Sequence, residues 1–156
     1  MTTPEMRLQE LGLNLPAISS PVANYVPYTR VGQMLYLSGQ TPKTSDGAPR
    51  GGKLGADATV AEGYADARQC ALQMIAVAKS AVGDLSRVSI VKVFGMVNAV
   101  ADFKDHPKVI NGASDLFVEV FGENGRHARS AVGMGSLPGG VTVEVEAILR
   151  VTGTGD

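Results

Sequence analysis

Three charged residues near the end of the chain have the types and spacing that could do chemistry. Arg129 stands in a run of small and apolar residues, ARSAVGMGSLP, and Glu144 and Glu146 stand in VTVEVEAIL. A guanidinium offers paired donors that match a carboxylate, and an ionised glutamate can hold or deprotonate a water molecule. These residues either line a site for a small acid or place ordinary charges on the wet face of a sheet.

The strand-like pattern around these residues does not decide between the two interpretations. Thr142, Glu144 and Glu146 alternate with valines, so the two glutamates share one face of the predicted strand. Earlier in the chain, Ser38 and Gly39 close another apolar run. A glycine there allows the backbone to approach a ligand closely, and serine is a small donor.

Metal and cofactor sites are not indicated. The two histidines, His106 and His127, are far apart and Cys70 is the single cysteine, so no metal-ligand spacing exists. The sequence also has no GxxxxGK loop, no GxSxG turn and no dinucleotide fingerprint. We expect no metal and no cofactor. His106 precedes a proline at a helix start, Cys70 is an inert core residue, and His127 is either a loop residue or a ligand contact near Arg129.

The elements that must position these residues follow from periodicity and from turn residues. A short helix is predicted between Thr3 and Gly12, and a long loop is predicted over residues 43–57. The predicted strands and main helices, in chain order, are Tyr25–Arg30, Met34–Gln40, a helix from the Thr59 capping box to Gly83, Val88–Val97, a helix from Pro107 to Phe121, and two strands within His127–Val151.

This order predicts an α+β fold in which two main helices cover one face of a mixed or antiparallel sheet. We expect a single domain over residues 1–156, with residues 1–20 as an N-terminal helical extension. The other face of the sheet is too apolar for water in Met34–Gln40 and Val88–Val97, which predicts a homo-oligomer whose sheets pack together.

Composition narrows the classes of partner. The formal net charge is −1, and no basic run is interleaved with aromatic residues, so we expect no nucleic-acid partner. No stretch of 18 apolar residues and no signal-peptide pattern occurs. We therefore expect no membrane partner and a cytoplasmic location.

Taken together, three segments resemble the RidA/YjgF family of reactive-intermediate deaminases, which also carries an endoribonuclease (L-PSP) name. They are YVPYTRVGQMLYLSGQ, the helix that contains Asn111, and ARSAVGMGSLPGGVTVEVEAI, so the resemblance runs from about Tyr25 to Val151. It implies a chorismate-mutase-like fold and a homotrimer with a cleft at each subunit interface.

The resemblance also implies a reaction and roles for residues. Arg129 would pair with the carboxylate of a 2-imino or 2-enamino acid, and Glu144 would position the water that converts it to a 2-keto acid and ammonia. The same cleft would be lined by Tyr25, Ser38, Gly39, Asn111 and Ala131, the last of which stands where many members have cysteine. The alternative is a non-catalytic trimeric module that binds a small carboxylate or has a regulatory role. A ribonuclease is the third choice, because no basic groove and no acid/base histidine pair is indicated.

Overall fold

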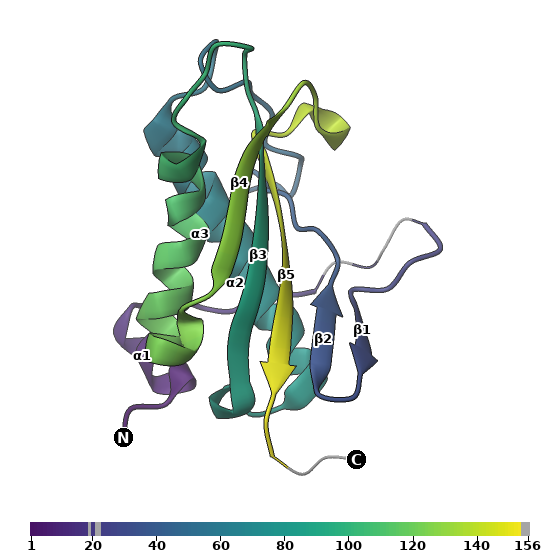
Figure 1. Ribbon diagram of the computed structural model, residues 1–156, viewed down its shortest axis with the longest axis vertical. Helices are drawn as coiled ribbons and strands as arrows, with labels where there is room; N and C mark the ends of the chain where they lie inside the picture. Colours follow the sequence, from purple (N-terminus) through teal and green to yellow (C-terminus); the bar gives the residue numbers. More distant parts are fainter. Residues whose placement is uncertain (19, 21–22, 154–156) are drawn as a thin grey trace.

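A mixed sheet of five strands, in the order β1-β2-β5-β3-β4, runs through the protein (Figure 1). The computed structural model describes residues 1–18, 20 and 23–153. The strands are β1 (Tyr28–Val31), β2 (Met34–Leu37), β3 (Val88–Asn98), β4 (Ala128–Met134) and β5 (Val143–Val151). β3 and β4 are parallel and the other neighbours are antiparallel. A parallel pair needs a crossover, which α3 (His106–Phe121) supplies.

The helices α2 (Val60–Val82) and α3 cover one face of this sheet (Figure 1). α2 begins with the predicted capping box, in which Thr59 and Glu62 each accept a hydrogen bond from the other's backbone N–H. Between the helices and the sheet lies the apolar core, with Phe117 and Met74 fully buried. The predicted α+β fold is confirmed. Within the described residues, no helix is both long and apolar enough to span a membrane.

The predicted N-terminal helix is α1 (Pro4–Glu10), and the side chain of Thr3 caps it. α1 docks at the C-terminal end of α2. The Glu5 carboxylate accepts a hydrogen bond from Lys79 Nζ at 2.7 Å and another from the backbone N–H of Leu85 at 3.0 Å. The short helix is therefore fixed to the helical layer by a buried leucine face and by these polar contacts.

The first two strands are shorter than the predicted spans Tyr25–Arg30 and Met34–Gln40, which were wrong at their outer ends. Pro27 has no N–H to donate, so it cannot continue a strand ladder. Its carbonyl instead accepts from the backbone N–H of Ser38 at 2.9 Å, and the Ser38 hydroxyl donates to the Val26 carbonyl at 2.6 Å. These contacts fold the segment before β1 back onto the end of β2.

The predicted loop over residues 43–57 contains no helix or strand. It is nevertheless anchored to α2 through Asp66, a buried carboxylate with 4% of its surface exposed. Arg50 Nε lies 2.6 Å from Asp66 Oδ1, and the Thr142 hydroxyl donates to Asp66 Oδ2 at 2.6 Å. A single acidic group thus links the loop, α2 and the residue that precedes β5.

The close approach of α2 and α3 depends on Gly112. A Cβ atom at this position would lie 1.9 Å from the backbone carbonyl oxygen of Tyr64 on α2. Gly112→Ala should therefore lower the free energy of unfolding by about 2–3 kcal/mol, because backbone cannot yield as a side chain can. Alanine's better helix propensity, about 0.5–1 kcal/mol, offsets only part of this loss. Urea denaturation followed by circular dichroism measures the difference.

Gly135→Ala is the matched control, because a Cβ atom at Gly135 would meet nothing within 4 Å. We expect it to leave the free energy of unfolding within about 0.5 kcal/mol of the wild-type value. Equal stability of the two variants would contradict the packing described for α2 and α3.

Candidate functional site

Arg129 lies on β4, an edge strand of the sheet, and its side chain reaches α3. Its Nη1 atom donates to Asn111 Oδ1 at 2.9 Å and to Ser114 Oγ at 3.1 Å. Both acceptors stand on α3 three residues apart, so they project from the same side of the helix. Asn111, which the resemblance assigned to the same cleft as Arg129, therefore contacts Arg129 within one chain, and Ser114 contacts it as well.

These two bonds orient the guanidinium. The Nη1 nitrogen carries two hydrogens, and both are directed to α3. Within the part of the chain that the structure describes, no acceptor is bonded to Nε or Nη2 of Arg129. The Nε–H and one Nη2–H form the parallel pair of donors that grips a carboxylate through both oxygens. α3 thus holds one edge of the guanidinium and leaves the carboxylate-binding edge available.

His127 extends this arrangement. Its Nε2 lies 2.8 Å from Ser114 Oγ, its Nδ1 lies 2.6 Å from the Gly125 carbonyl oxygen, and its ring meets Phe117 edge-on. Burial lowers the pKa of His127; the bond to Gly125 opposes this, and the charge of Arg129 lowers the pKa further. The sequence left open whether His127 is a loop residue or lies near a ligand, and the structure places it in the surroundings of Arg129.

Ser114 was not predicted as a site residue. Serine in an amphipathic helix carries no distinctive pattern, and its spacing from Asn111 was the one available indication. Ala131 lies two residues after Arg129 on the same side of β4, since it is the strand partner of Gly95, which packs against Ile110 of α3. Ala131 thus adjoins the Arg129 group and packs on the core.

Glu144 belongs to a different group, at the end of β2. A Cβ atom at Gly39 would lie 3.0 Å from Glu144 Cδ, so the absence of a side chain at Gly39 allows the carboxylate to lie against the backbone there. Burial raises the pKa of Glu144, and the negative charge of Glu146 raises it further. A carboxylate in this environment is a stronger base than that of an ordinary glutamate.

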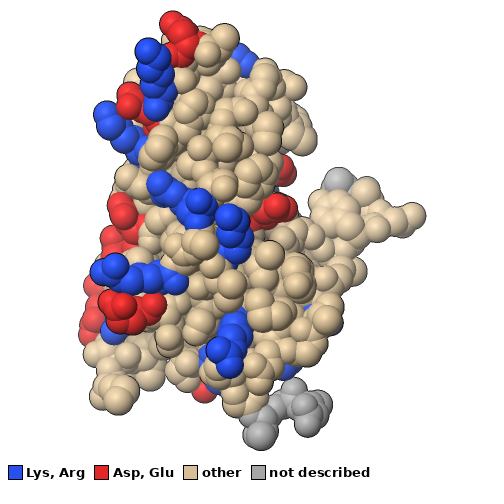
Figure 2. Space-filling model, viewed as in Figure 1, with Lys and Arg blue, Asp and Glu red and all other residues tan. Residues whose placement is uncertain are grey.

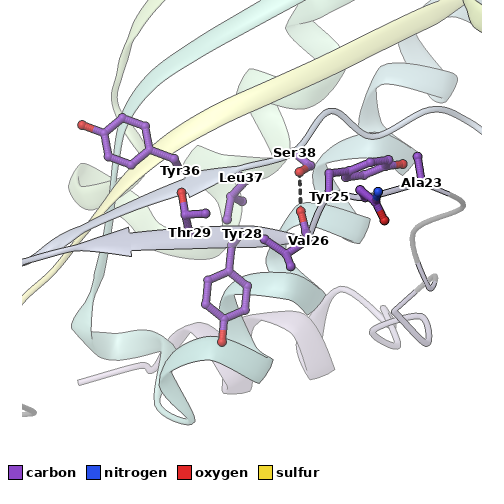
Figure 3. Close-up of a pocket in the computed structure, with 9 residues that line it drawn as sticks. Ala23, Tyr25, Val26, Tyr28, Thr29, Tyr36, Leu37 and Ser38 are labelled. Atoms are coloured by element: carbon purple, nitrogen blue, oxygen red, sulfur yellow. Dashed lines mark hydrogen bonds between the residues drawn. The ribbon is translucent and has the colours of Figure 1, made fainter.

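An open pocket of about 780 Å³ lies beside this group. Figure 3 shows the Ser38 hydroxyl bonded to the Val26 carbonyl, with the ring of Tyr25 next to them and Tyr36 at the far end. Tyr25 has 53% of its surface exposed, which is high for an aromatic side chain. The pocket is lined by Ala23, Asn24, Tyr25, Val26, Tyr28, Thr29, Tyr36, Leu37 and Ser38.

The strand register places the two groups on opposite faces of the sheet. Val93 on β3 is the strand partner of Arg129 on β4, and Val93 is fully buried beneath the helices. Met96 on β3 is the strand partner of Glu144 on β5. The alternation of side chains directs Met96 and Glu144 away from the helices. In one chain, therefore, Arg129 and Glu144 do not face a common cavity.

The seven predicted site residues divide accordingly. We call the first set the guanidinium group and the second the strand-end group. The guanidinium group contains Arg129, Asn111 and Ala131, to which the structure adds Ser114 and His127. The strand-end group contains Tyr25, Ser38, Gly39 and Glu144.

A family model described as "YjgF/chorismate mutase-like, putative endoribonuclease" matches residues 5–142. The chain belongs to this family. The matched range includes α1 from Glu5 onward, which the sequence resemblance left outside, and it ends before β5, so it does not reach Glu144. The predicted resemblance to the RidA/YjgF family and the predicted chorismate-mutase-like fold are confirmed.

Similar proteins come from distant organisms. Protein TCP17 of Trypanosoma cruzi is 49% identical over 146 residues, which cover 92% of this chain and 91% of that protein. A crystal structure from Shewanella oneidensis, which carries the same endoribonuclease name, is 42% identical, with a TM-score of 0.91 over 96% of this chain and 99% of that one.

A structure named RidA, from an Antarctic Psychrobacter, is similar at 28% identity, with a TM-score of 0.60 over 86% of this chain and 94% of that one. The fold of this chain therefore matches the Shewanella structure closely and matches that RidA structure less closely.

Proposed function

We propose that this protein hydrolyses reactive 2-imino or 2-enamino acids to 2-keto acids and ammonia. The observation that carries the proposal is the geometry of Arg129, whose Nη1 is held by Asn111 and Ser114 while its Nε/Nη2 edge is left for a carboxylate. Membership of a family that includes a structure named RidA agrees with this substrate class.

We further propose that the site forms between copies of the chain, in a homotrimer. The guanidinium group and the strand-end group lie on opposite faces of one sheet, so two copies are needed to bring them together. The face away from the helices is suited to such contact, because it carries Tyr36, Phe94, Met96, Val132 and Ile148. Figure 2 shows the surface over β2 and β1 largely uncharged, whereas charged atoms gather over α3.

In the proposed reaction, Arg129 of one copy holds the substrate carboxylate and Glu144 of the next faces the C=N carbon. Glu144 takes a proton from water as the oxygen bonds to that carbon, giving a carbinolamine. Starting from the protonated imine, Glu144 then returns this proton to the amine nitrogen, and the C–N bond breaks as an oxygen lone pair forms the C=O bond. The hydroxyl proton passes to Glu144, and ammonia leaves with a 2-keto acid. Such imines also hydrolyse in water, so positioning and electrostatics need to supply only modest acceleration.

The direct experiment generates imino acids in place with an amino-acid oxidase or a serine/threonine dehydratase and follows keto-acid release. We expect the protein to accelerate release from at least one of the serine-, leucine- and arginine-derived imines. No acceleration with any of them, together with calorimetric binding of pyruvate, would replace the proposed enzyme with a carboxylate-binding module. A protein that neither accelerates keto-acid release nor binds pyruvate would contradict both functions.

A further inference from the structure

A chain of hydrogen bonds links His127 to Arg129 through Ser114. The Gly125 carbonyl can only accept, so the 2.6 Å contact fixes the hydrogen on His127 Nδ1. In neutral His127 the other nitrogen, Nε2, then accepts, and the Ser114 hydroxyl donates to it at 2.8 Å. This leaves the lone pairs of Ser114 Oγ for Arg129 Nη1, at 3.1 Å.

Protonation of His127 reverses one of these bonds. Nε2 then carries a hydrogen and donates to Ser114 Oγ, which already accepts from Arg129. Two cations would share one oxygen atom, and the Ser114 hydrogen would have to point away from both. The arrangement therefore favours neutral His127 as long as the charge of Arg129 is not balanced.

We propose that His127 is a positioning residue for Arg129, and that a carboxylate bound to Arg129 and a proton bound to His127 stabilise each other. The inference rests on the proposed function, because it takes Arg129 to be the carboxylate clamp. A bound carboxylate offsets the guanidinium charge that disfavours the imidazolium. By reciprocity, a proton on His127 strengthens carboxylate binding by the same factor.

Among the residues that the structure describes, Arg129 is the charged group that faces His127. The acidic residues of α3, Asp115 and Glu119, are bonded instead to Tyr64 and Arg68 of α2. In the 3-10 turn η2 (Gly122–Gly125), Glu123 pairs with Arg126 at the exposed surface.

The sign of the coupling follows. The affinity for a carboxylate should rise as pH falls through the titration of His127. With a guanidinium and a carboxylate several ångströms from the ring, we expect pyruvate to bind about three- to tenfold more tightly below that titration than above it.

The experiment uses the full chain and pyruvate as the probe. The chain has two histidines, so the imidazole signals in a nuclear magnetic resonance titration can be assigned with one variant, His106→Gln. We expect saturating pyruvate to raise the pKa of His127. In parallel, calorimetry at several pH values should show the increase in affinity in the wild type and its loss in His127→Gln.

Glu144 also titrates, so the calorimetry is repeated in Glu144→Gln, where the remaining pH dependence belongs to His127. Pyruvate binding that leaves the His127 titration unmoved would overturn the coupling and leave the proposed function standing. Absence of pyruvate binding at every pH would overturn the carboxylate clamp and this inference with it.

Discussion

Replacing Arg129 with alanine should lower kcat/KM for an imino acid by about 100- to 1000-fold, since a bidentate charge-assisted pair with the substrate carboxylate is lost. Pyruvate affinity should fall in the same variant, because the pair is made before and during the reaction. Arg129→Lys should recover little of the lost kcat/KM, since an ammonium group does not offer the two parallel N–H donors of a planar guanidinium. Steady-state keto-acid release and calorimetry measure these effects.

The matched control is Arg126→Ala. Arg126 is an exposed arginine three residues earlier that pairs with Glu123 at the surface. We expect kcat/KM within twofold of the wild-type value for this variant, since exposed pairs contribute about 0–1 kcal/mol. Full activity of Arg129→Ala, with its assembly unchanged by size-exclusion chromatography, would contradict the clamp.

Replacing Glu144 with glutamine should lower kcat by about 10²- to 10⁴-fold, which is the range that a positioned general base supplies. Pyruvate affinity should stay close to the wild-type value, because the carboxylate is held by Arg129 and not by Glu144. The effect on kcat without an effect on binding distinguishes this variant from Arg129→Ala.

The pH profile adds a test of sign. Glu144 must be ionised to accept a proton from water, so activity should fall as pH drops through its pKa. Because burial and Glu146 raise that pKa, the fall should begin at a higher pH than for an ordinary glutamate. Glu146→Gln, a change at the exposed neighbour on the same face, should keep activity and move the fall to lower pH. If the activity of Glu144→Gln falls at the same low pH as that of the wild type, Glu144 is not the base.

Much of the fold followed from the sequence where local rules act alone. The capping box at Thr59 and the apolar spacing of two helices predicted α2 and α3, and Thr3 with Pro4 predicted α1. The start of β1 did not follow, because Val26 and Pro27 bond to Ser38 across the chain, and such contacts leave no periodic pattern.

The candidate site followed only in part. Residue types made Arg129 and Glu144 candidates. The alternation of side chains along each strand, taken separately, cannot show which face of the sheet points to the helices. The placement of the two residues on opposite faces depends on the register of β4 and β5 with β3. Ser114 and His127 became visible only when α3 was packed beside β4.

The most direct test of a site shared between copies mixes two inactive variants. Arg129→Ala and Glu144→Gln subunits are unfolded together in equal amounts, refolded, and assayed for keto-acid release. If each site combines Arg129 of one copy with Glu144 of the next, about a quarter of the sites receive both intact residues and about a quarter of the wild-type activity returns. Assemblies that form normally yet stay inactive would contradict the proposed site.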